Sequence, residues 1–439
     1  MAEGIGGLGR AESLGSLAAV LLFKALLDVA GFVVVPTLFA PYTLTLAPDP
    51  VKGLESYVLL VALVAALPRR INRLSELFLW SLVLLIQVPM LAVFWLSGEA
   101  REWAYATSAF WVAVGLINGA GIRLGSIPVL REGQTILAII LVSGAMVVLA
   151  HVGLITIRAG LRISFNLAAV YETRAIFQKA AASGAAYAFN WGAFVLLPLA
   201  MAWGLTRRHW TALTAAVVGQ MALFWASGNK IYLFAPVIVV SICLGLPRGK
   251  VTPRMLASGL ALAVGLASVS FLVVNDAWMS ALLTNRLLLL PAVISYNHFD
   301  FFSAHPFALL AHSVFSGVLP SPYERPVPQV IGEVYFANPE NWANSGMLGD
   351  AFMNFGLTGV VLLVPAVVGL LVVIDALAKG KDVRLAAATA AMPVLFLVNG
   401  GFLSSVLTGG LGLALVILFL LPPTRGGDGE AQWGRPADA

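Results

Sequence analysis

Basic side chains gather in the stretch 158–186, which separates two apolar runs of the chain. The stretch has a net charge of +3, because four basic residues accompany a single acidic one. Guanidinium groups match phosphate oxygens with paired hydrogen bonds, so these residues are candidate ligands for a diphosphate group. The other interpretation is that they extend from helix ends towards lipid headgroups. The four residues are Arg158, Arg162, Arg174 and Lys179, and Arg174 lies farthest from the apolar runs.

The tetrapeptide Ser227-Gly228-Asn229-Lys230 is a second candidate anion site, because it joins two apolar runs through a very short turn. A lysine at membrane depth is costly unless it has a partner. The neighbouring glycine permits a close approach of the backbone to a ligand. An anion bound by Lys230 and an ordinary polar turn are both consistent with this sequence.

The stretch 275–345 carries the most varied side chains. Aromatic rings beside polar groups suit sugars, whose C–H faces stack on rings, and they equally suit an aromatic belt at a membrane interface. Three of the five histidines lie seven residues apart, but Pro306 interrupts the helical face that they would share, so we predict no metal site. The candidates for substrate contact or proton transfer here are Arg286, His312, Arg325, Glu333 and Tyr335.

The composition indicates which elements hold these residues in place. Of 439 residues, 60% are hydrophobic and only 11% are charged, and the mean hydropathy is +0.92. In soluble domains, roughly a quarter of all residues are charged. We therefore predict an all-α integral membrane protein with about 12 transmembrane helices, within a range of about 11–13. The predicted spans are 14–36, 54–68, 74–97, 103–119, 134–157, 187–205, 211–226, 231–246, 255–274, 346–374, 386–402 and 406–421.

Lysines and arginines predict the orientation. Most of those in the connections fall on the side of the N-terminus, so both termini are expected in the cytoplasm. Residues 1–425 then form a single polytopic membrane domain, and 426–439 form a short cytoplasmic tail. The connections 158–186 and 275–345 are expected to be enlarged external loops with short helices, and connections of that length usually carry function.

Other properties of the chain exclude several classes of protein. The positive-inside bias accounts for the net charge of +5 and the pI near 9.4, so no nucleic-acid partner is expected. A single cysteine, Cys243, provides neither a disulfide framework nor a thiolate metal site. The absence of an internal sequence repeat weakens the interpretation as a transporter built from duplicated halves.

Two polar residues lie inside the predicted span 346–374. Asp350 and Asn354 are one helical turn apart, and ionisable groups within a membrane are functional candidates because their burial is costly. The alternative is a hydrogen bond between helices, helped by the small residues around them. Asn344, in the polar stretch just before this span, is a further candidate for substrate contact.

The run WANSGMLGDAFMNFGLTGVVLL, which contains these residues, resembles a signature near the C-terminal end of Wzy-type O-antigen polymerases, which join oligosaccharide repeat units in bacteria. The SGNK turn is similar to the Ser-Gly-basic turn of these polymerases and of the related O-antigen ligases. The basic composition of the connection 158–186 and the mixed polar and aromatic composition of the connection 275–345 also fit the family pattern. The resemblance covers the layout of residues 150–375 and about 40 residues in motif.

The resemblance implies a specific activity. Members of this family are glycosyltransferases of the bacterial inner membrane, and they use undecaprenyl-diphosphate-linked oligosaccharides on the periplasmic side. They transfer the growing chain onto the non-reducing end of a new lipid-linked unit and release undecaprenyl diphosphate. The resemblance implies no cofactor, no metal and no nucleotide sugar; it leaves open inversion or retention at the anomeric carbon, and a chain-length regulator is a further candidate partner.

This chain departs from the family pattern in two places. Some polymerases carry an arginine followed by glycine after fifteen or ten residues, whereas Arg174 is followed by Gly184 after nine. The ligases carry a histidine before the asparagine that precedes the late helix, and this chain has Ala343 before Asn344. The second departure weakens the interpretation as a ligase.

Glycosyl transfer from a lipid diphosphate needs cations for the leaving group and a base for the acceptor hydroxyl. The expected catalytic residues are Glu333, Asp350 and His312. The expected ligands of the diphosphate or sugar are Arg162, Arg174, Lys230, Arg286, Arg325, Asn344 and Tyr335. The alternatives are an O-antigen ligase or other polyprenyl-phosphate-sugar transferase, a flippase or transporter for lipid-linked oligosaccharides, and a non-catalytic membrane scaffold.

Overall fold

The computed structural model describes residues 2–39, 44–125, 127, 130, 132–160, 170–180, 184–246, 251–313, 315 and 318–424. All the regular secondary structure of these residues is helical, as the sequence predicts. The chain divides into two compact units. Unit 1 comprises residues 1–123, 251–372 and 397–403, and unit 2 comprises residues 124–250, 373–396 and 404–439.

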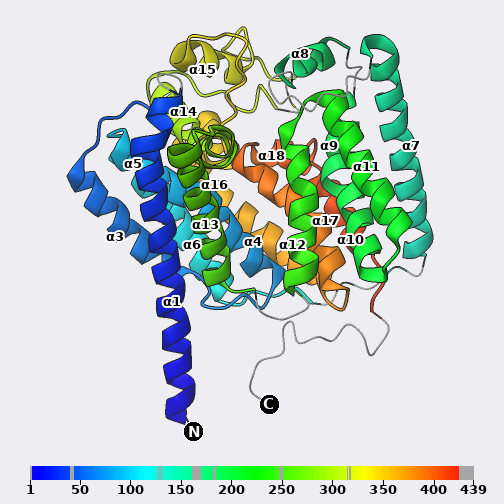
Figure 1. The fold of residues 1–439 in the computed structure, drawn as a ribbon, viewed down its shortest axis with the longest axis horizontal. Coiled ribbons are helices and arrows are strands. Elements are labelled where there is room, and N and C mark those ends of the chain that lie inside the picture. Colours follow the sequence, from blue (N-terminus) through cyan, green and yellow to red (C-terminus); the bar gives the residue numbers. More distant parts are fainter. Residues whose placement is uncertain are drawn as a thin grey trace. The chain divides into compact units, whose positions relative to one another are not determined.

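Unit 1 is built mainly from residues 1–123 and 251–372, which pack together although they are far apart in sequence (Figure 1). Helix α1 lies along α13, for example. The elements of unit 1 are α1 (Ala2–Val29), η1 (Ala30–Val34), α2 (Val35–Phe39), α3 (Pro50–Ala66), α4 (Leu74–Leu82), η2 (Val83–Gln87), α5 (Val88–Leu96), α6 (Arg101–Gly119), α13 (Pro253–Val274), η6 (Ser280–Leu289), α14 (Leu290–Ala304), α15 (Val327–Phe336) and most of α16 (Gly346–Ala378).

Unit 2 contains the helices between residues 124 and 250, together with helices of the later segments 373–396 and 404–439. Within it, α10 packs against α11, α12 and α17, and α17 packs against α19. Its elements are α7 (Gly133–Ala159), α8 (Val170–Ala180), α9 (Ala185–Trp191), η3 (Gly192–Leu196), α10 (Leu197–Arg207), α11 (Trp210–Ser227), η4 (Lys230–Leu233), α12 (Phe234–Gly245), α17 (Val383–Leu395) and α19 (Leu411–Leu420). Two short elements, η7 (Phe396–Val398) and α18 (Phe402–Val406), contain two of the points where the chain passes between the units.

Seven helical segments of the described residues are long and apolar enough to cross a membrane, which indicates a multi-pass membrane protein. Each predicted span coincides with a helix, but five of the twelve fall outside these seven. Three of the five are shorter apolar helices, at 230–245, 383–398 and 411–420, and the other two are α3 and α6. The helical pattern of the prediction is therefore confirmed, and the number of crossings stays a prediction.

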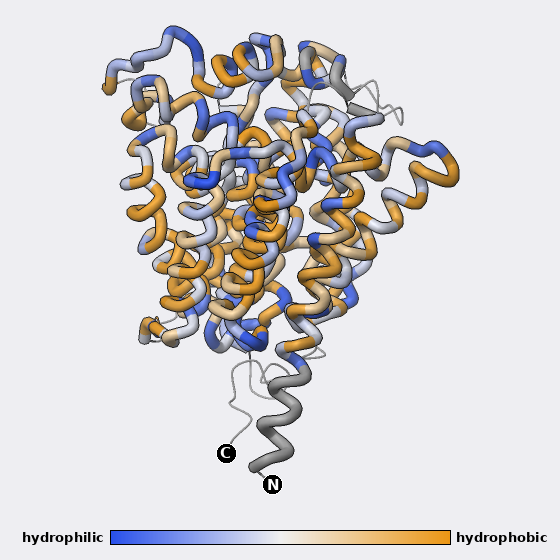
Figure 2. Tube along the Cα trace, turned by 90° about the vertical axis from the view of Figure 1, so that its left-hand side faces the viewer, coloured by the Kyte–Doolittle hydropathy of each residue, from blue (hydrophilic) through white to orange (hydrophobic). Residues whose placement is uncertain are grey.

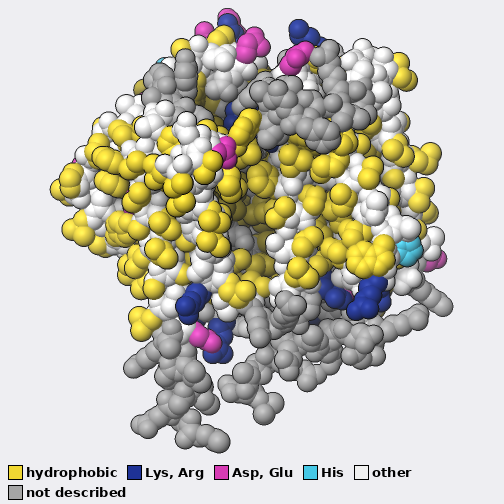
Figure 3. Space-filling view, in the orientation of Figure 1, with side chains coloured by type: hydrophobic (Ala, Val, Ile, Leu, Met, Phe, Trp, Pro, Cys, Tyr) yellow, Lys and Arg dark blue, Asp and Glu magenta, His cyan; other side chains and the backbone are white. Residues whose placement is uncertain are grey.

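The exposed faces of the long helices carry apolar side chains, as a lipid solvent requires. Hydrophobic residues run along most of the helical trace (Figure 2), and their side chains cover the surface that α1 and α13 form (Figure 3). Among them, Leu22 is 54% exposed and Leu262 is 62% exposed. Such a surface is unfavourable in water and suits hydrocarbon.

In the described residues, each of the four π-helical segments ends two residues before a proline. Proline has no N–H and its ring collides with the carbonyl four residues earlier. A local turn with i→i+5 hydrogen bonds accommodates the ring without breaking the helix. The prolines are Pro36 after η1, Pro89 after η2, Pro198 after η3 and Pro291 after η6.

The stretch 275–345 contains more structure than short helices in a loop. Elements η6 and α14 follow each other directly from Ser280 to Ala304 and pack against α2, α5 and α13. The buried side of α14 includes Tyr296, His298 and Phe302. Hydropathy did not predict α14 as a packed helix, because its polar residues lower the mean hydropathy of the segment. These residues are surrounded by protein and not by lipid.

The predicted span 346–374 is broken, which corrects the interpretation of Asp350 and Asn354 as neighbours within one continuous membrane helix. Phe355 has φ −141° and Gly356 has φ +60° with ψ −147°, so α16 consists of two helices that meet at these residues. The Asn354 side chain supports the break: its Nδ2 donates to the Asp350 carbonyl at 2.8 Å, and its Oδ1 accepts from the Leu310 N–H at 2.7 Å. Asp350 and Asn354 therefore belong to the short first helix.

Gly356→Ala should destabilise the protein by about 1–3 kcal/mol, because its backbone conformation is essentially restricted to glycine. A Cβ there would also lie 2.9 Å from the Phe307 ring. The measurement is the thermal unfolding midpoint of the purified protein in detergent. Gly369→Ala is the matched control: it lies in the same helix with nothing within 4 Å of a Cβ, so the midpoint should stay or rise slightly. Equal midpoints for the two variants would contradict the broken helix.

Candidate functional site

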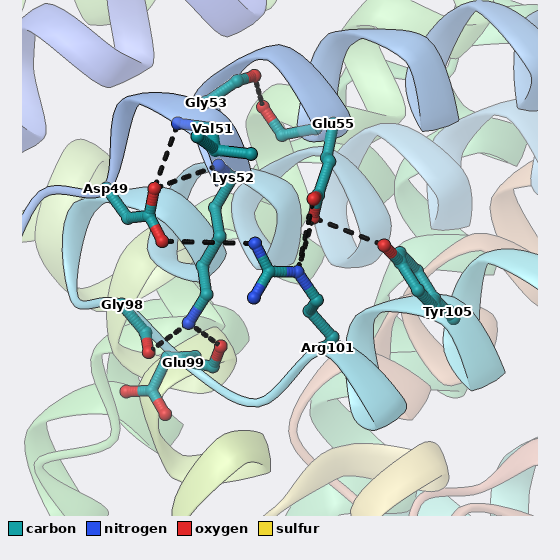
Figure 4. A network of polar contacts seen from close by, with 10 residues as sticks. Asp49, Val51, Lys52, Gly53, Glu55, Gly98, Glu99, Arg101 and Tyr105 are labelled. Atoms are coloured by element: carbon teal, nitrogen blue, oxygen red, sulfur yellow. Dashed lines mark hydrogen bonds and ion pairs between the residues drawn. The ribbon is translucent and has the colours of Figure 1, made fainter.

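In unit 1, a polar network joins the start of α3 to the connection between α5 and α6 (Figure 4). Helix α5 ends in a Schellman motif: Gly98 has φ +64°, and the Glu99 N–H donates to the Phe94 carbonyl at 3.0 Å. The Lys52 ammonium of α3 donates to the Gly98 and Glu99 carbonyls at 2.5 and 2.7 Å. The backbone of Glu99 is thereby fixed from two sides.

Arg101 forms the second part of this network. Its Nε donates to both carboxylate oxygens of Glu55 at 2.9 and 3.1 Å, and its guanidinium lies 4.0 Å from the Asp49 carboxylate. The Tyr105 hydroxyl also donates to Glu55 at 3.2 Å. Asp49 caps α3 by accepting from the Val51 N–H at 2.9 Å. These charges compensate one another at the start of α3 and α6.

The Glu99 carboxyl has a different environment from the other acids of the network. Burial, and then the charge of Asp300 on α14, raise its pKa to about 7, against the opposing effect of Lys52. The Tyr335 hydroxyl of α15 donates to Asp300 at 2.5 Å. Burial together with Asp300 and Glu99 raises the pKa of Tyr335 well above its ordinary value. Glu99 is therefore a carboxyl group that changes its charge near neutral pH.

Aromatic rings pack beside this group. Trp103, in the first turn of α6, stacks on Phe299 with centroids 5.2 Å apart and meets the edge of Phe352 at 5.1 Å. Phe307 packs edge-on against Phe352 at 6.1 Å and is 37% exposed. The rings connect α6, α14 and the first helix of α16.

The structure brings some of the predicted site residues together. Arg325 and Glu333 form an ion pair at 2.9 Å, and both side chains are about half exposed. Tyr335 lies on the same helix as Glu333 but bonds to Asp300 instead. Arg286 is exposed on η6, and Asn344 is exposed just before α16. These residues do not form one constellation with Glu333.

Asp350 takes part in a local structural contact. It lies partly buried in the first helix of α16 and accepts a hydrogen bond from the Phe402 N–H. A Cβ on Gly401 would lie only 2.4 Å from the Asp350 carboxyl carbon, so the glycine is required for this approach. Asp350 therefore ties α16 to the chain between η7 and α18.

The three histidines that are seven residues apart have separate partners. His298 is buried with Nδ1 at 2.9 Å from the Ile294 carbonyl, and His305 contacts the Phe301 carbonyl at 2.8 Å. His312 lies 2.7 Å from the Ser321 hydroxyl, and partial burial lowers its pKa. In the part of the chain that the structure describes, no group of three or more His, Cys, Asp or Glu side chains is arranged to hold a metal ion.

Two of the predicted anion ligands, Arg174 and Lys230, lie in unit 2. Arg174 is exposed on α8, which packs against α11, and its charge acts on the Tyr232 hydroxyl. Lys230 begins η4, the short helix that contains Tyr232. The Tyr232 hydroxyl donates to Asn190 Oδ1 at 2.8 Å. Arg162 lies outside the described residues.

The sequence analysis missed Lys52 and Glu99. A signal was present in Ser97-Gly98-Glu99, because a glycine directly after an apolar run marks a helix end that fixes the next residue. The charge that acts on Glu99 belongs to Asp300, which is 201 residues away in the sequence, and no local pattern connects the two residues.

No family model, curated protein or solved structure matches this chain.

Lys52→Met should destabilise the protein by about 1–3 kcal/mol, because two carbonyls at the α5 terminus lose a charged donor. The measurement is the thermal midpoint in detergent at pH 7.5. Lys379→Met is the control: this lysine is exposed, and its replacement should change stability by no more than about 0.5 kcal/mol. A Lys52 variant as stable as the control would contradict the role of Lys52 in fixing the 98–99 connection.

Proposed function

We propose that the protein is a glycosyltransferase that polymerises undecaprenyl-diphosphate-linked oligosaccharide repeat units, as O-antigen polymerases do. It would reside in the inner membrane of a bacterium with its active site towards the periplasm. The observation that carries the proposal is that Arg174, exposed on α8, acts with its charge on Tyr232 of η4, the short helix that Lys230 begins. Two cations suit the oxygens of a diphosphate.

The contacts of each unit support the prediction of which connections share a side of the membrane. In unit 1, Lys52 bonds the 98–99 connection, and both segments are predicted to be external. Arg70 and Glu12, both predicted to be cytoplasmic, pair at 2.9 Å. In unit 2, Trp191 donates to the Leu407 carbonyl at 2.8 Å, again between segments on the external side. An error in the grouping of these connections would pair segments that are predicted to lie on opposite sides.

The chemistry needs little beyond charge and position. The bond from the anomeric carbon of the donor sugar to its diphosphate oxygen breaks, and its electron pair leaves with undecaprenyl diphosphate. A new bond forms from that carbon to a hydroxyl oxygen of the acceptor sugar, which gives up a proton to a base. Cations that neutralise the developing charge on the diphosphate are worth more in a site with little water.

Replacing either cation should slow polymerisation by about 10²- to 10³-fold, the cost of removing one group that stabilises developing charge. The variants are Arg174→Ala and Lys230→Ala, and the purified protein receives lipid-diphosphate-linked repeat units without nucleotide sugar or divalent metal. Products are resolved on a gel, where the wild-type protein should give a ladder spaced by one repeat.

Lys379→Ala is the control, because Lys379 is an exposed lysine that is not among the predicted ligands. It should keep the ladder. Transfer only to added lipid A-core would identify a ligase instead. If wild-type protein gave neither product, or if both cation variants matched the control, the proposed function or its cationic site would be wrong.

A further inference from the structure

A short basic turn joins α10 to α11 in unit 2. The helical segments Ala185–Arg207 and Trp210–Ser227 are each long and apolar enough to cross a membrane, and only two residues separate them. Gly204 allows the two helices to meet closely, because a Cβ there would lie 2.9 Å from the Leu213 nitrogen. The packing therefore holds the turn at the depth where the apolar segments end, which in a membrane is the depth of the lipid headgroups.

Arg208 has a backbone conformation that favours glycine. It ends α10 with φ +56° and ψ +33°, and the His209 N–H then donates to the Gly204 carbonyl at 2.8 Å. Glycine is the usual residue at this position of a helix end, because a Cβ is strained there. Of the five described residues other than glycine that have a positive φ, Arg208 is the only charged one. The fold therefore keeps an arginine where a glycine would be less strained.

The guanidinium groups of Arg207 and Arg208 have no protein partner among the described residues. Both residues are exposed, and neither side chain forms a hydrogen bond or an ion pair in this part of the chain. The charge of Arg207 does act on Asp382, which precedes α17. However, Arg384 already binds that carboxylate, since its Nε and Nη2 donate to the two oxygens at 3.0 and 2.7 Å. Two neighbouring arginines thus keep their donors for an anion that the described residues do not supply.

Exposed tryptophans lie close to these arginines in the sequence and at the same helix ends. Trp203 is 41% exposed and Trp210 is 64% exposed. The Trp203 ring also packs against the His209 ring, with centroids 5.1 Å apart. Figure 3 shows basic and hydrophobic side chains gathering near the lower end of α11. Tryptophan is favoured where acyl chains meet headgroups, so these surroundings suit a lipid better than a free anion in water.

We infer that the turn between α10 and α11 binds the phosphate of an anionic phospholipid. Arg207 and Arg208 provide the donors, because guanidinium groups match phosphate oxygens with paired hydrogen bonds. Trp203 and Trp210 lie against the headgroup end of the acyl chains. The turn is on the predicted cytoplasmic side, so the lipid belongs to the inner leaflet. This inference is independent of the proposed function, and its test requires no glycosyl transfer.

The test compares two lipids with the same acyl chains, phosphatidylglycerol and phosphatidylcholine, whose choline group offsets the phosphate charge. Native mass spectrometry of the purified full-length protein in detergent gives an apparent Kd for each. The wild-type protein should bind phosphatidylglycerol more tightly, and Arg207→Gln and Arg208→Gln should each weaken that binding by about fivefold. Arg123→Gln is the matched control: it removes another exposed arginine that is predicted to be cytoplasmic, and it should keep the wild-type Kd.

Arg208→Gly separates lipid binding from folding. Glycine relieves the left-handed backbone strain at this position. In detergent without lipid, the variant should therefore unfold at the same temperature as the wild type or slightly above it, while its Kd for phosphatidylglycerol rises about fivefold. A loss of binding in this variant cannot come from a damaged fold.

Three outcomes would overturn the inference. The first is an equal Kd for the two lipids in the wild-type protein. The second is that the Arg207 and Arg208 variants bind phosphatidylglycerol as tightly as Arg123→Gln does. The third is displacement of phosphatidylglycerol by inorganic phosphate but not by sodium chloride of the same ionic strength, which would identify a site for free anions.

Discussion

Hydrocarbon offers no hydrogen bonds, so a chain within a membrane must satisfy its backbone N–H and C=O groups internally. This constraint explains the helical architecture and the way in which the helices depart from regularity. Proline at four places follows a widened π turn, which accommodates the ring within a continuous helix. Next to the break in α16, the Asn354 amide donates to the Asp350 carbonyl and accepts from the Leu310 N–H, which belongs to another segment.

The same constraint acts at the ends of helices, where carbonyl groups lack partners within the helix. Both units use a lysine from a neighbouring element to satisfy them. In unit 1, Lys52 bonds the carbonyls that follow α5, and in unit 2, Lys381 bonds the carbonyls of Leu418 and Phe419 at the end of α19. A positive charge at a helix C-terminus is also favoured by the helix dipole. Lysines near these membrane helices thus have structural roles that a sequence pattern does not distinguish from anion binding.

The sequence predicted helices well because an apolar run is a property of neighbouring residues. It predicted Arg174 and Lys230 as anion ligands, and that stays a prediction: the charge of Arg174 acts on Tyr232, and Lys230 begins the short helix that contains Tyr232. It could not predict Glu99, because the environment of this residue depends on Asp300 and Tyr335, which are more than 200 residues away. Glu333 stood out in the sequence as an acid in a long loop, but it pairs with Arg325 eight residues earlier.

Two places in unit 1 show how differently charge is treated within the fold. At the middle of the first span, Lys24 and Asp28 pair at 2.7 Å, Tyr57 donates to the same carboxylate at 2.8 Å, and the charges of the pair cancel. At Glu99, two carboxyl groups face one lysine whose hydrogen bonds go to carbonyls. The first arrangement joins α1 to α3 without net charge. In the second, burial and the charge of Asp300 raise the pKa of Glu99 to about 7.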